Sequence, residues 1–335
     1  MKFNEKLTFS GASAVLMVGL VLAAGAGTAS AAVTPPITGS GSTLIAPLIN
    51  QWNASLGGGI TYGGGGSGKG VTDISNGVTD FGASDAPLIG DQIGKCAGCL
   101  TIPIALTAVT VVYNVPGIGN GLKLTPKLIN LIYIGNINKW NDGRIAKINK
   151  GLSLPDLPIT TIHRSDGSGS TYAFTDFLVR SKSGWQSKGT LVSWPLGLAV
   201  PGSGGVANAL KTPGTIGYVG VDYAIPNKLT VAALQNSAGK FVLPSQKGIR
   251  AGAAWVKKVP KSGIVHFCAP PKTEKAAYPA DTPSYIITRK GANSAGVRTM
   301  VNYALGKGLG ISQDIGFAPL PKPVVAAGKA TAKKL

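Results

Sequence analysis

The sequence predicts an α/β fold, and three segments of similar design carry that prediction. In each segment an extended apolar run leads into a Gly/Ser-rich turn and then into a helical pattern; the segments are 37–56, 60–78 and 159–179. Repeated strand–turn–helix units are typical of layered α/β proteins. The length of 335 residues suits two ordinary domains or one domain with two lobes.

The turns of these units read GSGST, YGGGGSGKG and RSDGSGST in chain order. The tail from Lys322 is rich in Ala and Lys and has no acidic residue, so we expect a frayed end or a short surface helix. Periodicity predicts further strands at 106–114, 214–219, 229–234 and 284–289, and further helices at 126–132, 206–210 and 292–306.

Residues 1–31 have the pattern of a secretory signal peptide. Lys2 and Lys6 precede an uncharged apolar stretch, and the Ala-Ser-Ala tripeptide ending at Ala31 fits the small-x-small cleavage rule. The alternative is a retained membrane anchor, which the Gly and Ser content disfavours. We expect an exported protein, cleaved near Ala31, that resides in the periplasm or at the outer face of the cell membrane or cell wall.

Export makes a disulfide the favoured state of paired cysteines. Cys96 and Cys99 form a C-x-x-C motif, and Cys268 stands far downstream. We expect a structural bridge between two of the three, with the Cys96–Cys99 pair favoured and one thiol left over. Two histidines and three cysteines are too few for a metal site, so we expect neither metal nor cofactor.

The chain is strongly basic, with 32 Lys and Arg against 13 Asp and Glu and a net charge of +19. This charge predicts anionic partners and raises the local concentration of anions. Nucleic acid is disfavoured, because the bases are spread along the chain, aromatic residues make up only 7%, and no nucleic-acid motif is present. A second hypothesis is an acidic habitat, in which few carboxylates limit destabilisation by acid.

The Gly/Ser turns are candidate anion sites. A helix start exposes unpaired N–H groups with partial positive charge, glycine lets a ligand approach, and Ser or Thr adds hydroxyl donors. Ser and Thr are also ordinary helix caps, so a single turn says little. Three such turns, if they converge, surround a small tetrahedral oxyanion with donors.

Three charged residues refine this picture. Arg164 at the third turn can bind an oxyanion, and Asp166 either holds Arg164 in place or caps the helix. Asp85 in DFGASDAPL either caps a turn or accepts a hydrogen bond from a protonated ligand. Phosphate near neutral pH still carries a proton and sulfate does not, so a buried Asp85 selects phosphate.

Two enzymatic motifs fail. The segment 63–70 resembles a nucleotide-binding P-loop, but Gly70 stands where the metal-binding hydroxyl is required. A serine hydrolase needs a histidine base, and no Gly-x-Ser-x-Gly elbow is present; we interpret His163 and His266 as structural.

The motifs GSGSTLIAP, YGGGGSGKGVTDISNGVTDFGASDAPL and RSDGSGSTYAFTDFL together resemble the phosphate-binding proteins of bacterial ABC importers, the PstS type of the periplasmic-binding-protein superfamily. Further agreement at YNVPG, IYIGNINKWND, WPLGL, PGTIGYVGVDYA and GFAPLP extends the resemblance over nearly the whole mature chain. It implies a type II fold in which two α/β lobes close on phosphate across a hinge. The implied lobes are 33–108 with 287–335, and 109–286.

The resemblance also implies the phosphate site. The ligand-binding residues carried over are Thr43, the backbone of Leu44, Ser67, Asp85, Arg164, Ser168, Gly169 and Ser170, with Asp166 supporting the arginine. Leu44 replaces a frequent aromatic residue, Ser170 a frequent threonine and Lys69 a small residue that is usual there. The lipid-accepting cysteine of many Gram-positive relatives is also missing.

The expected function is an extracytoplasmic receptor that captures inorganic phosphate and delivers it to the ABC permease of a phosphate importer. We expect a monomer that binds no nucleic acid and catalyses no reaction. The alternatives are a receptor for another oxyanion such as sulfate or arsenate, an extracellular phosphatase, and a surface adhesin that reuses the fold.

Overall fold

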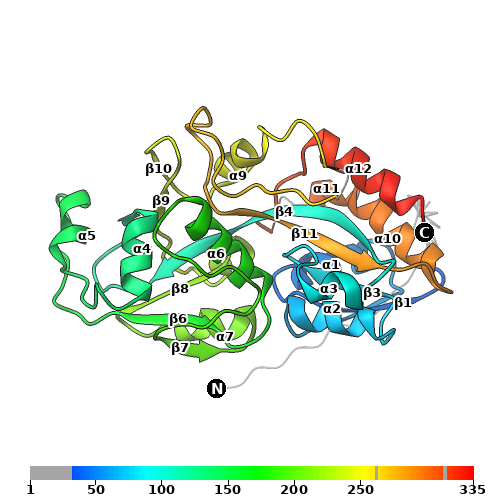
Figure 1. Cartoon of the computed structure of the whole chain (residues 1–335), viewed down its shortest axis with the longest axis horizontal. Coiled ribbons are helices and arrows are strands. Elements are labelled where there is room, and N and C mark those ends of the chain that lie inside the picture. The colour runs from blue at the N-terminus through cyan, green and yellow to red at the C-terminus, as the bar shows by residue number, and fades with distance from the viewer. Residues whose placement is uncertain (1–31, 261–262, 312–314) are drawn as a thin grey trace, which may run out of the picture.

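The computed structural model describes residues 32–260, 263–311 and 315–335. The predicted signal peptide, 1–31, lies outside the described residues. Within the described ranges no helix has the length and apolar character needed to cross a bilayer. Strands and helices alternate along most of the chain, which confirms the predicted α/β class (Figure 1).

One long sheet organises the molecule, with strands in the order β2-β1-β3-β11-β4-β8-β6-β7. A smaller sheet has the order β10-β9-β5. The strands are β1 (Ile37–Gly41), β2 (Ile60–Gly64), β3 (Phe81–Ser84), β4 (Leu100–Tyr113), β5 (Lys123–Leu124), β6 (Thr160–Arg164), β7 (Leu198–Val200), β8 (Thr215–Gly220), β9 (Ala233–Gln235), β10 (Phe241–Val242) and β11 (Asp281–Thr288).

The helices gather around the two ends of the long sheet (Figure 1). Helices α1–α3 and α10–α12 lie at the end that holds β1–β3, and α4–α7 lie at the end that holds β6 and β7. Their bounds are α1 (Ala46–Ser55), α2 (Ser67–Ser75), α3 (Asp91–Lys95), α4 (Pro126–Tyr133), α5 (Gly143–Ile148), α6 (Gly169–Arg180), α7 (Gly202–Ala209), α8 (Val221–Ala224), α9 (Gln246–Ala253), α10 (Ser294–Ala304), α11 (Gly308–Ile311) and α12 (Lys322–Ala332).

The three predicted strand–turn–helix units are present as β1–α1, β2–α2 and β6–α6. Strands β2, β1 and β3 pair in parallel, and so do β8, β6 and β7. Because parallel strands end at the same edge of a sheet, the turns that follow them gather at that edge. Within each set the turns therefore lie at one edge, and the two sets run in opposite directions because β3–β11, β11–β4 and β4–β8 are all antiparallel pairs.

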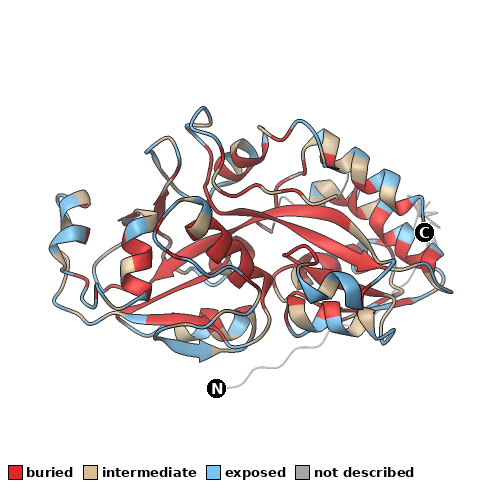
Figure 2. Cartoon of the chain, viewed as in Figure 1, coloured by how far each residue is buried: buried red, intermediate tan, exposed pale blue. Residues whose placement is uncertain are grey.

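Strands β4 and β11 join the two ends of the sheet. Residues 100–108 of β4 pair with β11, and residues 109–113 pair with β8. Both strands are buried along almost their whole length, and Figure 2 shows them as the continuous buried centre of the molecule. Strand β4 reads as a largely apolar run, whereas β11 carries polar residues, among them Asp281, Thr282 and Ser284, that are buried in the same centre.

Some predicted elements were wrong in extent. Strand β4 begins at Leu100 rather than at residue 106, and the predicted strand 229–234 is reduced to β9 and a single bridge at Val231. The N–H of Val231 donates to the Asn120 side chain at 2.8 Å, which takes the place of a ladder partner. The tail from Lys322 forms a helix, which is one of the two alternatives expected for it.

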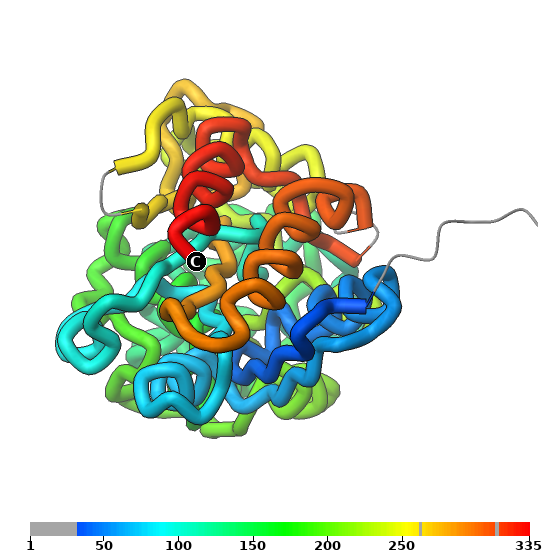
Figure 3. Tube along the Cα trace, turned by 90° about the vertical axis from the view of Figure 1, so that its right-hand side faces the viewer, coloured from blue at the N-terminus to red at the C-terminus, as the bar shows by residue number. Residues whose placement is uncertain are grey.

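Helix α12 lies beside α10 and packs on β4 (Figure 3). Its inward face buries Val324, Gly328 and Ala332. The expected Cys96–Cys99 disulfide is present after α3, and Cys268 is a free, buried thiol.

Candidate functional site

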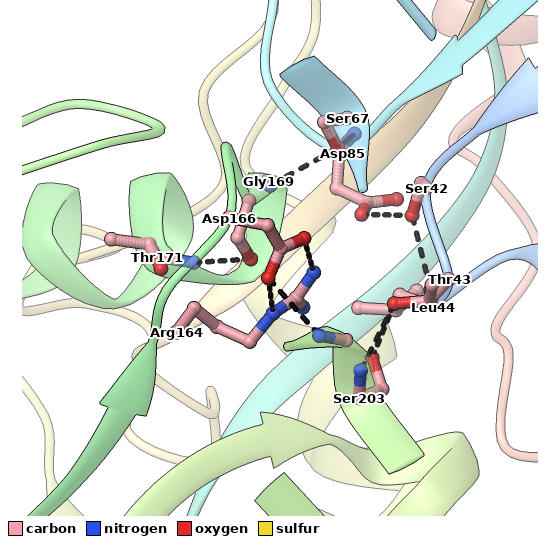
Figure 4. Close-up of polar contacts among 12 residues, drawn as sticks. Ser42, Thr43, Leu44, Ser67, Asp85, Arg164, Asp166, Gly169, Thr171 and Ser203 are labelled. Atoms are coloured by element: carbon pink, nitrogen blue, oxygen red, sulfur yellow. Dashed lines mark hydrogen bonds and ion pairs between the residues drawn. The ribbon is translucent and has the colours of Figure 1, made fainter. Parts of the chain in front are cut away.

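The predicted turns converge where the ends of β1–β3 face the ends of β6 and β7 (Figure 4). We call residues 42–45 the first turn, 65–67 the second turn and 165–168 the third turn. The first two follow β1 and β2, and the third joins β6 to α6. Asp85 follows β3 directly and lies between them.

Asp85 is fully enclosed, with 1% of its surface exposed. Its Oδ2 accepts a short hydrogen bond from the Ser42 hydroxyl, and its Oδ1 accepts one from the Ser284 hydroxyl at 2.6 Å. Burial raises the pKa of Asp85, while the hydroxyl groups and the charge of Arg164 oppose that rise. The hydroxyl donors orient the carboxyl group as an acceptor.

Arg164 ends β6 with its guanidinium group buried, and Asp166 holds it in a fixed orientation. Arg164 Nε donates to Asp166 Oδ1 at 2.6 Å, and Nη2 donates to Oδ2. Asp166 Oδ1 also accepts from the N–H of Gly202, the first residue of α7, at 3.0 Å. Burial favours a raised pKa for Asp166, but hydrogen bonds and charge from Arg164 outweigh it and hold the pKa below its ordinary value. A guanidinium has five N–H donors, so this pair leaves others for an anion.

Ser67 joins the two sides of the site. Its Oγ accepts from the N–H of Asp85 at 3.2 Å and from the N–H of Gly169 at 3.0 Å. A Cβ on Gly169 would lie 2.6 Å from both Asp85 Cβ and Ser67 Oγ. Only glycine permits the start of α6 to approach Asp85 this closely.

The second and third turns are also in direct contact. The N–H of Gly68 donates to the carbonyl of Gly167 at 2.8 Å. Gly66 has a φ of 90°, and a Cβ there would overlap the Asp166 carboxylate. The two ends of the long sheet are therefore closed on each other at the site.

The first turn supplies a hydroxyl that the sequence did not single out. Ser42 Oγ donates to Asp85 and accepts from the N–H of Leu44 at 3.1 Å. The predicted ligand residue Thr43 instead meets Ser203 of α7, with 2.9 Å between the hydroxyl oxygens, and its Oγ1 accepts from the N–H of Ser203 at 3.1 Å. Thr43 thus ties the first turn to the opposite end of the sheet.

Ser168 and Ser170 have different surroundings at the start of α6. The Ser168 hydroxyl caps the helix by accepting from the N–H of Thr171 at 3.2 Å. The Ser170 hydroxyl is buried and has no hydrogen-bond partner among the described residues. A buried hydroxyl without a partner is costly, so Ser170 retains a donor for a ligand.

This network has no excess of formal positive charge. Arg164 is offset by Asp166, and Asp85 contributes a further acid. An anion held here is therefore bound by oriented donors rather than by excess positive charge. The positive charge of Lys69 is turned to its own helix, where Nζ pairs with Asp73 Oδ2 at 2.6 Å.

The two histidines lie outside this network. His163 is 8% exposed and stacks on Trp194 with 5.0 Å between ring centroids. Burial lowers the pKa of His163. His266 lies 3.8 Å from Asp176, and burial lowers its pKa as well.

Sequence reasoning missed several residues of the site. Ser42 lies inside the quoted GSGST motif and was identifiable as a second hydroxyl of the first turn. Ser284 and Ser203 have no local signal, because only the pairing of β11 with β3 and the approach of α7 bring them to the site. Asp222 lies beside Gly220 at the start of α8 and was also not singled out.

Comparisons with known proteins agree with this architecture. Residues 26–307 match the family model described as the PBP superfamily domain. The chain is 36% identical to the phosphate-binding protein PstS of Xylella fastidiosa strain 9a5c, over 86% of this chain and 82% of that protein. It is 33% identical to PstS of Haemophilus influenzae, over 90% of this chain and 94% of the relative.

Solved structures share the fold at lower identity. A phosphate ABC transporter substrate-binding protein from Clostridium perfringens, crystallised with phosphate, has a TM-score of 0.63 at 19% identity and covers 85% of this chain and 99% of its own. The phosphate-binding protein PfluDING has a TM-score of 0.72 at 22% identity, with 88% and 93% covered. The fold is thus that of the periplasmic binding proteins, and the chain belongs to the PstS family of phosphate-binding proteins within the PBP superfamily.

Proposed function

We propose that this chain captures inorganic phosphate outside the cytoplasm and delivers it to the permease of an ABC importer. The observation that carries the proposal is the convergence of three Gly/Ser turns on the buried carboxyl group of Asp85 and the Arg164–Asp166 pair. The relatives named PstS support phosphate as the ligand and transport rather than catalysis as the role.

The chemistry of the site favours a protonated oxyanion. Asp85 can accept a hydrogen bond from the protonated oxygen of phosphate, whereas sulfate offers no proton and would face the carboxylate with like charge. Arg164 and the free hydroxyl of Ser170 are the donors for the remaining oxygens. The same Asp85 therefore binds phosphate and rejects sulfate.

We further propose that the two ends of the long sheet act as lobes that part to admit phosphate. The predicted lobes, 33–108 with 287–335 and 109–286, meet at β4, whose partner changes from β11 to β8 at residues 108–109. The second predicted boundary falls inside β11, which starts at Asp281. Closure excludes water and strengthens the contacts with the anion. A monomer, exported by the predicted signal peptide, suffices for this role.

Calorimetric titration of the mature, phosphate-stripped chain with phosphate and sulfate tests the proposal. The wild type is expected to bind phosphate and to show little sulfate binding. Asp85→Asn keeps the shape of the side chain but removes its charge. A hydrogen bond to a charged group contributes about 1.5–3 kcal/mol, so phosphate binding should weaken by a factor between about 10 and about 150.

Sulfate binding should improve in Asp85→Asn because the like-charge repulsion is gone. Asp156→Asn is the matched control, since Asp156 is an exposed aspartate whose partner is Lys139. A folded wild type that binds no phosphate, or that prefers sulfate, would contradict the proposal. Unchanged selectivity in Asp85→Asn would remove the assigned role of Asp85.

A further inference from the structure

Asp222 is a buried carboxyl group beside the site that phosphate capture, as derived above, does not use. It follows β8 in the first turn of α8 and is 5% exposed. In the part of the chain that the structure describes, neither carboxyl oxygen has a hydrogen-bond partner of good geometry. An ionised carboxylate without partners is among the most costly groups to bury, so the fold favours the protonated form.

Asp222 lies next to Leu44 of the first turn, and Gly220 adjoins both side chains. A Cβ on Gly220 would overlap Asp222 Oδ1 and would lie 2.9 Å from Leu44 Cδ1. The carboxyl group and the Leu44 side chain therefore share the space beside Gly220. Leu44 carries the backbone N–H that the resemblance assigns to phosphate, so Asp222 flanks the ligand site without belonging to the predicted set.

The charged surroundings of Asp222 also favour its protonated form. Burial raises the pKa of Asp222 well above its ordinary value, and the nearby Asp85 raises it further. The N–H groups of Asp222 and Tyr223 at the start of α8 oppose the rise and do not outweigh burial. The charge of Arg164 acts on the neighbouring Tyr223. Burial and Asp222 raise the pKa of Tyr223, and Arg164 lowers it.

The elements packed against α8 supply no cation to Asp222. They are β4, α7 and β8, whose titratable residues are only Tyr113 and Tyr218. Gly316 approaches from the loop before α12, and its described neighbours, Ile315 and Phe317, do not titrate.

We propose that Asp222 is a second acid of the phosphate site, which stays protonated while phosphate is bound, so that phosphate affinity falls as the pH rises. The inference rests on the proposed function. Bound phosphate places negative charge at the first turn, next to a carboxyl group that would otherwise ionise. Two negative groups in a site without bulk water repel each other strongly. Bound phosphate therefore favours the protonated form of Asp222. Because protonation and phosphate binding are thermodynamically linked, loss of that proton weakens phosphate binding.

The test compares wild type with Asp222→Asn by calorimetric titration of phosphate from pH 5 to pH 9. Asparagine keeps the shape of the side chain and stays uncharged at every pH. The two proteins should bind alike at pH 5. Above the pKa of Asp222 in the free protein, the wild type should lose affinity relative to the variant by up to about tenfold per pH unit. Protonation of phosphate itself is common to both proteins and cancels in this ratio.

Asp281→Asn is the matched control. Asp281 is another buried carboxyl group without a partner in the described structure, and burial alone raises its pKa. This control should follow the wild-type pH profile. A constant ratio between wild type and Asp222→Asn from pH 5 to pH 9 would overturn the inference, as would an identical effect of Asp281→Asn.

Two further results distinguish failure of the Asp222 inference from failure of phosphate binding itself. Absence of phosphate binding by either protein at every pH refutes the proposed function, and the inference with it. If Asp222→Asn does not fold, calorimetry of the wild type from pH 5 to pH 9, at each pH in two buffers of different ionisation enthalpy, replaces it. Proton uptake that exceeds the requirement of phosphate itself and appears as the pH rises supports the inference, and its absence over the whole range overturns it.

Discussion

Closure of the site depends on the missing side chain of Gly169, the first residue of α6. In Gly169→Ala, the new Cβ would lie 2.6 Å from Asp85 Cβ and 2.7 Å from Asp85 N, closer than the 3.0 Å limit of real contacts. These neighbours are backbone or attached directly to backbone, so the two sides of the site must move apart. We therefore expect the variant to fold normally and to bind phosphate weakly.

The size of the effect follows from the bonds that the movement breaks. The Gly169–Ser67 hydrogen bond of 3.0 Å and the Gly68–Gly167 hydrogen bond of 2.8 Å both join the two sides. Each contributes about 0.5–1.5 kcal/mol net, so their loss weakens phosphate binding about 5- to 150-fold. Alanine is favoured over glycine in a helix, so unfolding of the phosphate-free protein should not become easier.

Calorimetry with phosphate and thermal melting without and with phosphate measure both effects. Gly143→Ala is the matched control, because Gly143 also begins a helix and a Cβ there meets nothing within 4 Å. It should retain wild-type affinity. Wild-type affinity in Gly169→Ala, or an equal loss in Gly143→Ala, would refute the closure argument.

Two other predictions concern charge. Arg164→Lys loses the paired hydrogen bonds to Asp166 and should weaken phosphate binding at least about tenfold, as measured by calorimetry, whereas Arg144→Lys at the exposed Arg144–Asp142 pair should not. Burial raises the pKa of Asp281, so the wild type should lose stability as the pH rises from the unfolded pKa through the folded pKa. Denaturant unfolding of wild type and Asp281→Asn should diverge over that range, with the variant the more stable at high pH; parallel curves would contradict this.

The predictable part of the fold is the local part. Each strand–turn–helix unit could be predicted because the spacing of its apolar residues changes from a strand pattern to a helix pattern at a Gly/Ser turn. Strand β4 was predicted too short because Pro103 usually ends a strand, whereas here it pairs with Tyr285 next to a register shift that accommodates it.

The candidate site divides in the same way. Arg164 and Asp166 lie two residues apart, and their pairing was predicted from that spacing together with the resemblance. The contact between Asp85 and Ser284 spans 199 residues and exists only because β11 returns beside β3. Asp222 was missed because nothing near it in sequence shows that its carboxyl group is buried.

A crystal structure of the mature chain with phosphate would show directly whether the three turns hold the anion. We expect one phosphate between the three turns, with a protonated oxygen facing Asp85 and other oxygens within hydrogen-bond distance of Arg164 and the Ser170 hydroxyl. A structure at saturating phosphate in which this site holds no anion, or in which phosphate is bound only elsewhere on the protein, would contradict this expectation.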